Sequence, residues 1–407
     1  MILGGGPRRY DWEAMSDMSD ELSPVSLKAP GGDTPAIGIG LCLSGGGYRA
    51  MLFHLGVVWR LAELGYLGTK DRTGKHGPIG TLQRVSSVSG GSIIAGVLGL
   101  AWDDLRVDDD DLLDRFRELV VLPIEKFASK TTISIWSGIW GSVVSTVNKT
   151  IARVYRRRLY GRKTLQDLPD SPRFVINATN LQSGALWRFS KPFTRDWRVG
   201  EIKNPTDSIA SVVGASSAFP PFLSPARFKY KEEQYTPGSG DGLQKRPFTT
   251  RPALSDGGVY DNMGLETVFK NFQTVIVSNA GGGYKPQKKI VGDWALQSYR
   301  VLNTIDNQVR SLRKRVLISS LATNKKFGAY WSIRSNIDGY PVGGKLDCPY
   351  ERTRKLADIP TDLAAKDQTT QRRLINWGYA VCDAGIRSWV EDDLPPPVDF
   401  PYPAERV

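Results

Sequence analysis

The chain has 407 residues, of which 40% are apolar and 24% are charged, enough for a large globular core in one elaborated domain or two. It contains neither the run of roughly 18 apolar residues that a membrane span needs nor an apolar leader, so we expect a cytoplasmic protein. Its formal charge of +12 predicts a surface that attracts polyanions such as nucleic acid or an anionic membrane.

The N-terminal part of the sequence predicts a tail and two similar structural units. Residues 1–35 are rich in Gly, Pro, Ser, Asp and Glu without periodicity, so we expect a flexible tail. A strand-like apolar run, a glycine turn and a helical pattern then follow twice. The strand, turn and helix of the two units lie at 37–43, 44–47 and 51–64, and at 82–88, 89–91 and 93–100.

The rest of the chain predicts an α/β fold with an insertion and an extension. We interpret residues 103–168, whose composition is unusual, as a helical insertion in a main domain that covers residues 36–283. Short strand-like runs return at 174–178, 254–255 and 274–278. Their alternation with helical patterns predicts a three-layer α/β/α fold with a mainly parallel central sheet. Residues 284–407 predict helices at 293–321 and 368–389, with loops, packed on that core.

One segment of the insertion has the pattern of an amphipathic helix. Its apolar residues recur at helical spacing, and a cluster of cations follows. The apolar residues are Trp136, Ile139, Trp140, Val143, Val144, Val147, Ile151 and Val154, and the cations are Lys149, Arg153 and Arg156 to Arg158. An interfacial helix that seats on anionic lipid has this pattern, and so does a core-facing helix with a basic end. The sequence leaves both interpretations open.

The segment SVSGG at 87–91 joins a predicted strand to an apolar helix, which is the context of a nucleophile elbow. Ser89 is the candidate nucleophile, because a sharp turn between small residues holds a hydroxyl clear of the backbone. The segment departs from Gly-x-Ser-x-Gly at Ser87, and a helix cap without chemistry is the alternative interpretation. A second approximate match, at 214–218, closes a helical pattern, so we expect its Ser216 at a helix end.

A serine nucleophile needs a partner that removes its proton, and the chain has two histidines. His54 and His76 both precede Ser89, so the chain order Ser, acid, His of the α/β-hydrolases is impossible. We expect His54 to pack on a helix face and His76 to lie in a solvated loop. The best-placed base is Asp256, where a strand-like run ends in Asp-Gly-Gly, because α/β folds place reactive groups at strand ends. An ordinary Asp-Gly turn is the alternative.

A glycine loop precedes the elbow. Gly45, Gly46 and Gly47 expose backbone amides at a helix N-terminus, and such amides hold an oxyanion or a phosphate. For Arg49, one turn into the helix, two roles are open: adding positive charge or anchoring the loop. The loop also matches the glycine pattern of a dinucleotide site. That site needs an acid at the end of a second strand, however, and Asp71 lies in a turn-like segment.

The glycine loop, the elbow serine and the downstream Asp-Gly-Gly occur in an order that resembles the patatin-like phospholipases. The resemblance covers roughly residues 37–283, apart from the insertion, and implies a catalytic domain with a three-layer patatin-like fold. The implied roles fall on Gly45, Gly46, Gly47 and Arg49 for the oxyanion hole, on Ser89 for the nucleophile and on Asp256 for its base. The resemblance implies no cofactor and no metal ion.

We therefore expect a lipid acyl hydrolase, peripheral at the membrane, that cleaves ester bonds of phospholipids or related lipids. The acidic run at 108–111 lacks the spacing of a calcium loop, and the three cysteines are too widely spaced for a paired metal site. Two alternatives stay open: a soluble carboxylesterase or thioesterase, and a non-catalytic module that binds nucleotide or nucleic acid. The resemblance also implies a small-molecule activator, for which the sequence has no motif. The oligomeric state is open too.

Overall fold

The computed structural model describes residues 35–105, 111–133, 144–221, 223–284, 286–290 and 292–407. Nearly all of the predicted tail over residues 1–35 and most of the acidic run at 108–111 lie outside the described residues. Trp136 and Trp140 of the insertion lie outside them as well.

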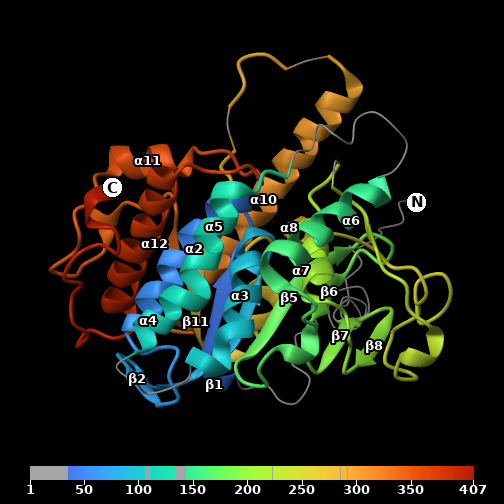
Figure 1. Cartoon of the computed structure of the whole chain (residues 1–407), viewed down its shortest axis with the longest axis horizontal. Coiled ribbons are helices and arrows are strands. Elements are labelled where there is room, and N and C mark those ends of the chain that lie inside the picture. The colour runs from blue at the N-terminus through green and yellow to red at the C-terminus, as the bar shows by residue number, and fades with distance from the viewer. Residues whose placement is uncertain (1–34, 106–110, 134–143, 222, 285, 291) are drawn as a thin grey trace, which may run out of the picture.

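A ten-stranded sheet forms the centre of the protein (Figure 1). Eight strands follow one another in the order β12-β11-β1-β4-β5-β6-β7-β8, while β10 pairs with β5 and β9. They are β1 (Ala36–Leu43), β4 (Leu82–Ser87), β5 (Arg173–Asn180), β6 (Leu186–Phe189), β7 (Phe193–Asp196), β8 (Gly200–Lys203), β9 (Ala226–Arg227), β10 (Ala253–Asp256), β11 (Phe272–Asn279) and β12 (Phe327–Ser332). From β12 to β5 the neighbours are parallel, and from β5 to β8 they are antiparallel.

Helices cover both faces of this sheet. They are α2 (Gly47–Glu63), α3 (Gly90–Leu105), α4 (Leu112–Phe116), α5 (Leu122–Lys130), α6 (Val144–Tyr155), α7 (Ile209–Ser216), α8 (Gly258–Asp261), α9 (Glu266–Phe269), α10 (Trp294–Ala322), α11 (Tyr350–Ala357) and α12 (Gln368–Trp389). On β1, Leu41 and Leu43 belong to a hydrophobic cluster that includes residues of α2 and α3. Cys42 belongs to a second cluster, with Val268 of α9 and Leu317 of α10. Because successive strand side chains point to opposite faces, the predicted three-layer α/β/α fold is confirmed.

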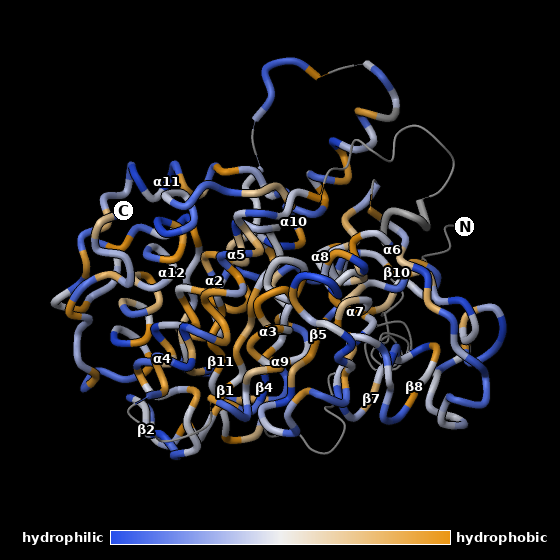
Figure 2. Tube along the Cα trace, viewed as in Figure 1, coloured by the Kyte–Doolittle hydropathy of each residue, from blue (hydrophilic) through white to orange (hydrophobic). Residues whose placement is uncertain are grey.

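The two predicted strand–turn–helix units are confirmed as β1 with α2 and β4 with α3. Figure 2 shows apolar residues along α3 and the neighbouring strands, and Ile93, Ile94 and Leu98 of α3 are buried, as their composition predicts. The helices predicted at 293–321 and 368–389 are α10 and α12. The sequence missed the hairpin of β2 (Arg72–Gly74) and β3 (Gly77–Gly80), because both strands are too short for a visible alternation of apolar residues.

The extension contributes an edge strand that the sequence did not predict. β12 pairs in parallel with β11 along its whole length, so residues beyond 283 complete the central sheet. Its apolar run is short and contains Gly328, whose φ of +121° favours glycine. A short run interrupted by glycine carries no clear strand pattern, which is why the segment was predicted as loop.

The described part of the amphipathic segment in the insertion packs against the protein. Ile151 and Tyr155 of α6 are fully buried members of the main hydrophobic cluster. Arg153, between them, is exposed. For these residues the core-facing interpretation is therefore correct.

Helix α12 lies directly against α2, and two glycines allow this contact. A Cβ on Gly56 would lie 1.9 Å from the carbonyl oxygen of Ile375, and a Cβ on Gly378 would lie 1.9 Å from that of Phe53. The backbones of the two helices therefore touch where neither chain carries a side chain. This close approach fixes α12 beside the helix that follows the glycine loop.

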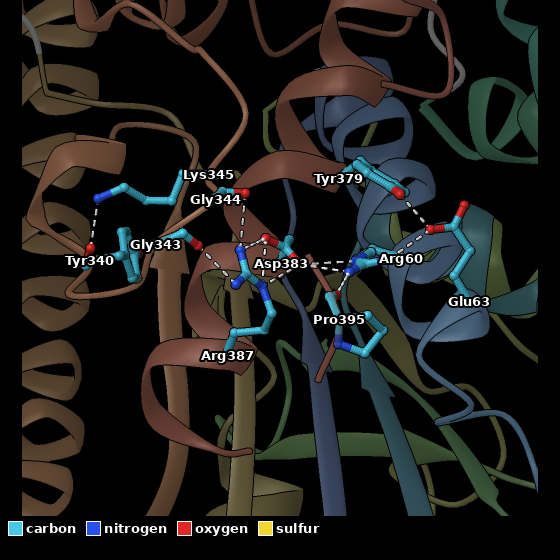
Figure 3. A network of polar contacts seen from close by, with 10 residues as sticks. All are labelled: Arg60, Glu63, Tyr340, Gly343, Gly344, Lys345, Tyr379, Asp383, Arg387 and Pro395. Carbon is cyan, nitrogen blue, oxygen red and sulfur yellow. Dashed lines mark hydrogen bonds and ion pairs between the residues drawn. The ribbon is translucent and has the colours of Figure 1, made fainter. Parts of the chain in front are cut away.

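A buried ionic network reinforces the contact between α2 and α12 (Figure 3). Asp383 accepts hydrogen bonds from Arg60 of α2, at 2.8 Å, and from Arg387, at 2.7 Å. Arg387 also donates to the carbonyl oxygen of Gly343, and Arg60 to that of Pro395. Asp383 therefore pairs with two buried guanidinium groups, one of which also pairs with Glu63, and the network joins three segments of the chain.

Replacing Asp383 with asparagine is expected to lower the free energy of unfolding by about 3–5 kcal/mol, because the buried guanidinium of Arg387 loses its anionic partner and that of Arg60 keeps only Glu63. The exposed pair between Asp399 and Arg406 supplies a matched control, since Asp399→Asn is expected to cost less than about 1 kcal/mol. Urea unfolding followed by tryptophan fluorescence measures both. Equal, small losses in the two variants would contradict the assigned role of Asp383.

Candidate active site

The carboxyl ends of β4 and β10 meet along one edge of β5. β4 runs parallel to β5, and its last residue, Ser87, pairs with Ile176. β10 runs antiparallel to β5, and its last residue, Asp256, pairs with Ala178. Because β6 occupies the opposite edge of β5 at Ala178, β10 takes over the edge that β4 leaves. Two strand ends that are far apart in the sequence are thus brought together.

Ser89 lies in the sharp turn between β4 and α3. Its φ of +50° falls in the left-handed region that residues other than glycine rarely adopt. Ser89 is buried, with 8% of its surface exposed. A Cβ on Gly90 would lie 2.1 Å from the carbonyl oxygen of Gly47, so the turn fits against the glycine loop because residue 90 has no side chain. This is the backbone shape of a nucleophile elbow.

Asp256 is the last residue of β10, and its carboxylate interacts with the Ser89 side chain. The Ser89 side chain lies close enough to lower the pKa of the carboxylate, and the amide of Gly258 donates a hydrogen bond to Oδ1 at 2.7 Å. Burial raises the pKa of Asp256 to about 7, although the Gly258 amide and the Ser89 side chain lower it, and the charge of Asp306 raises it further. We call Ser89 and Asp256 the dyad. A carboxylate with this pKa is a stronger base than an exposed one.

The Ser89 turn is held by the residue that the sequence offered as a rival nucleophile. Ser216 is the last residue of α7, so its predicted place at a helix end is confirmed. Its Oγ accepts the amide hydrogen of Ser89 at 2.9 Å and donates to the carbonyl oxygen of Asn177, on β5, at 2.7 Å. Ser216 is therefore a positioning residue, which the sequence could not reveal because the contact spans 127 residues.

The glycine loop joins β1 to α2 beside the elbow. Gly46 and Gly47 have φ values of +145° and +62°, which favour glycine. The amide of Gly45 donates to the carbonyl oxygen of Asn262 at 3.0 Å, so it is occupied, unlike the prediction for this residue. In the part of the chain that the structure describes, the amides of Gly46 and Gly47 have no acceptor. They lie at the N-terminus of α2, where an anion is stabilised.

Arg49 anchors the first turn of α2. Its guanidinium donates to the carbonyl oxygens of Ala280 (2.7 Å), Ala357 (2.8 Å) and Ile359 (2.7 Å). Burial lowers the pKa of Arg49 to about 10, and repulsion from Arg334 adds to this effect. Of the two roles that the sequence left open, the geometry supports the anchor, since the hydrogen bonds tie the glycine loop to the end of β11 and to the segment after α11.

Among the described contacts, neither histidine reaches the dyad. His54 of α2 is fully buried, with Nε2 at 3.0 Å from the carbonyl oxygen of Ser44 and Nδ1 at 2.9 Å from Ser278 Oγ. Because a carbonyl only accepts, Nε2 carries the hydrogen and Nδ1 accepts from Ser278, which in turn accepts from Trp331 Nε1. Burial lowers the pKa of His54 to about 3. His76 is exposed in the loop between β2 and β3, as predicted.

The described residues lack both a cluster of metal ligands and a helix suited to cross a membrane. No three His, Cys, Asp or Glu side chains gather there in a group that could hold a metal ion. Among the described helices, none combines the length and the apolar composition required to cross a bilayer.

Comparison with known proteins gives the family. The model of the patatin-like phospholipases matches residues 41–269, more than half of the chain, so the chain belongs to this family. No curated protein sequence gives a significant match.

Several solved structures match this chain at low identity. A human GIVD cytosolic phospholipase A2 in complex with a fluorophosphonate inhibitor and terbium is 14% identical, with a TM-score of 0.46 over 85% of this chain and 57% of that chain. Another structure of the human enzyme is 13% identical, with a TM-score of 0.37 over 59% of this chain and 45% of that chain. VipD from Legionella pneumophila is 16% identical, with a TM-score of 0.30 over 79% of this chain and 67% of that one. This chain therefore aligns with about half of the human enzyme's length.

The neutral state of His54 can be tested directly. With a pKa of about 3, the His54 ring is expected to stay uncharged above pH 4, in the Nε2–H tautomer. Nitrogen-15 NMR of the histidine side chains measures both properties, and His76→Gln identifies the remaining ring as His54. A His54 ring that gains its proton between pH 6 and 7 would contradict the buried, hydrogen-bonded arrangement.

Proposed function

We propose that this protein hydrolyses acyl ester bonds of phospholipids or related lipids with Ser89 as nucleophile and Asp256 as base. The observation that carries the proposal is the position of Ser89, in a sharp turn, beside a buried carboxylate whose pKa is about 7. A group with its pKa near the working pH is an efficient general base, because it is ionised and still binds a proton well. Membership of the patatin-like phospholipases supports lipid as the substrate class.

The first step forms an acyl-enzyme. Asp256 takes the hydroxyl proton while Ser89 Oγ attacks the ester carbon, and the carbonyl oxygen becomes an oxyanion. The amides of Gly46 and Gly47 then stabilise this negative charge, with the positive end of α2 behind them. As the tetrahedral intermediate collapses, the bond from carbon to the leaving alcohol breaks, and Asp256 returns its proton to that alcohol.

The second step releases the fatty acid. Asp256, again ionised, removes a proton from water, and the water oxygen attacks the acyl carbon. Collapse of the second tetrahedral intermediate breaks the bond to Ser89 Oγ, and the proton held by Asp256 restores the Ser89 hydroxyl. Each catalytic group ends in its starting state, and neither step requires a metal ion.

Loss of either member of the dyad is expected to remove activity. Ser89→Ala lacks the nucleophile and Asp256→Asn lacks the base, so each should lower fatty acid release from phospholipid by about a thousandfold or more. Ser89→Ala should also lose labelling by a fluorophosphonate probe. Fatty acid release is measured by mass spectrometry of purified wild type and variants.

A matched control separates chemistry from folding. Ser255→Ala removes a buried hydroxyl next to Asp256, one that donates to the carbonyl oxygen of Ala218, and it is expected to keep activity within about threefold. Chelation of divalent metal ions should leave the wild-type rate unchanged. Equal fatty acid release by wild type, Ser89→Ala and Asp256→Asn would remove both assignments. Release from short soluble esters as fast as from lipid would favour a carboxylesterase.

The pH dependence of kcat/KM should report the ionisation of Asp256. Because the base must be ionised, kcat/KM is expected to fall about tenfold per pH unit below pH 7 and to level off above it. Asp306→Asn removes a charge that raises the pKa of Asp256, so it should move this inflection to lower pH. Steady-state rates on a soluble ester give both profiles. An inflection near pH 4 in the wild type would exclude a buried carboxylate as the base.

A further inference from the structure

Helix α10 carries a long, exposed apolar stripe. In Figure 1 the helix, drawn in orange, projects from the body of the molecule, and Figure 2 shows apolar and hydrophilic residues alternating along it. Apolar residues that recur three and four positions apart lie on one face of a helix. The residues of the stripe are Trp294, Leu302, Ile305, Val309, Leu312 and Val316, and all are exposed, with 78% for Trp294 and 62% for Leu302. An uncovered apolar face of this length marks a contact surface.

The base of α10 is attached to the segments that carry the dyad. Arg313 forms an ion pair with Glu266 at 3.0 Å and contacts the carbonyl oxygen of Tyr260, in the short helix that follows Asp256. Arg310 donates to the carbonyl oxygen of Gly282 at 3.0 Å. The charge of Asp306, one residue after Ile305 of the stripe, also acts on Asp256. The stripe is therefore held close to the candidate active site.

Two further exposed apolar side chains flank the dyad. Val259 follows Asp256 by three residues, and Phe219 follows Ala218, whose carbonyl oxygen accepts the amide of Asp256. Both side chains are about half exposed. The apolar surface of α10 thus has a counterpart beside the dyad itself.

The charge of α10 indicates the partner. The helix contains five cations and one anion, namely Arg300, Arg310, Arg313, Lys314 and Arg315 against Asp306. Asp306 forms an ion pair with Arg310, and Lys314 and Arg315 are exposed. An apolar stripe bordered by cations, with an exposed tryptophan at the outer end, has the composition of helices that lie in the headgroup layer of anionic membranes.

We propose that α10 docks the protein on an anionic lipid surface, with the apolar stripe entering the boundary between headgroups and acyl chains. Lys314 and Arg315 then bind the anionic headgroups. The benefit of docking rests on the proposed function, because docking would bring the dyad to its lipid substrate. It assigns membrane binding to α10, whereas the sequence had suggested only a helix of the insertion.

A second copy of the chain is the rival occupant. The spacing of Leu302, Ile305, Val309, Leu312 and Val316 also suits the seam of a coiled coil. Two copies of a helix with net positive charge repel one another, however, whereas an anionic surface attracts both the helix and the protein of charge +12. The charges therefore favour lipid over self-association.

Sedimentation with sucrose-loaded vesicles tests the proposal on the full chain. The vesicles contain phosphatidylcholine with or without phosphatidylserine. Wild type is expected to bind the vesicles that contain phosphatidylserine, and the triple variant Leu302→Gln, Ile305→Gln and Leu312→Gln should bind them about tenfold or more weakly. The double variant Lys314→Glu and Arg315→Glu should lose the preference for phosphatidylserine. The substituted side chains are all exposed, so these variants are expected to fold.

A matched triple variant controls for the loss of surface apolarity. Leu113, Leu122 and Val398 are exposed and lie outside α10, so their replacement by glutamine should leave vesicle binding unchanged. Unaltered binding by the α10 triple variant would overturn the proposal. Failure of the wild type to bind vesicles would also overturn it. A third contradicting result is a wild type that sediments as a dimer while the α10 variant is a monomer with normal vesicle binding.

The same proteins separate this proposal from the proposed function. Hydrolysis of a short, soluble ester needs the dyad but no membrane, so the α10 triple variant should keep the wild-type rate on it while losing release from vesicles. If wild type cleaves neither substrate, the proposed function fails. The vesicle-binding result then still decides the role of α10 by itself.

Discussion

The meeting of two strand ends on one edge of β5 is the constraint on which the candidate active site depends. Ser89 lies in the turn that follows β4, and Asp256 is the last residue of β10. The two strands run in opposite directions along the same edge of β5. Strand side chains alternate between faces, so a slip of β10 by one residue would turn the carboxylate away from the serine. The burial of Asp256 raises its pKa, because a carboxylate removed from water holds a proton more strongly. The register of the sheet and the basicity of Asp256 therefore have a common origin.

Residues beyond the family match support the segments that form the candidate active site. The family model ends at residue 269, yet Arg49 reaches carbonyl oxygens of Ala357 and Ile359, and Trp331 of β12 closes the hydrogen-bond chain to His54. Helix α12 packs along α2 and adds the Asp383 network. Because α2 begins at the glycine loop, these contacts also stabilise the geometry of the Gly46 and Gly47 amides, for which the described residues supply no acceptor. The C-terminal region is thus part of the scaffold around the site.

Helix α10 and the dyad address two parts of one physical problem. An ester in a bilayer is surrounded by hydrocarbon and anionic headgroups, while the reaction needs a site from which most water is excluded. Under the two proposals, the projecting helix presents apolar and cationic groups to the first environment, and the buried serine and aspartate provide the second. Arg313 connects the two, since it joins α10 to Tyr260 in the segment that follows Asp256.

Local patterns in the sequence determined much of this protein. The apolar runs and glycine turns predicted β1 with α2 and β4 with α3, and the α10 and α12 helices, because their side chains repeat with a regular period. The absence of histidine after Ser89 pointed to a carboxylate base, and Asp256 was chosen because it ends a strand-like run. Short or glycine-containing strands such as β12 were not predicted, since they have too few residues to show a period.

The tertiary structure alone decided the contacts between distant segments. No local pattern indicates that Ser216 holds the elbow, that the amide of Gly45 is already bonded to Asn262, or that Arg49 binds three carbonyl oxygens. Each depends on residues brought together by the register of the sheet and by helix packing, and these positions are fixed by the whole core rather than by neighbours in the chain. The sequence thus named the chemical groups, and the fold determined which of them meet.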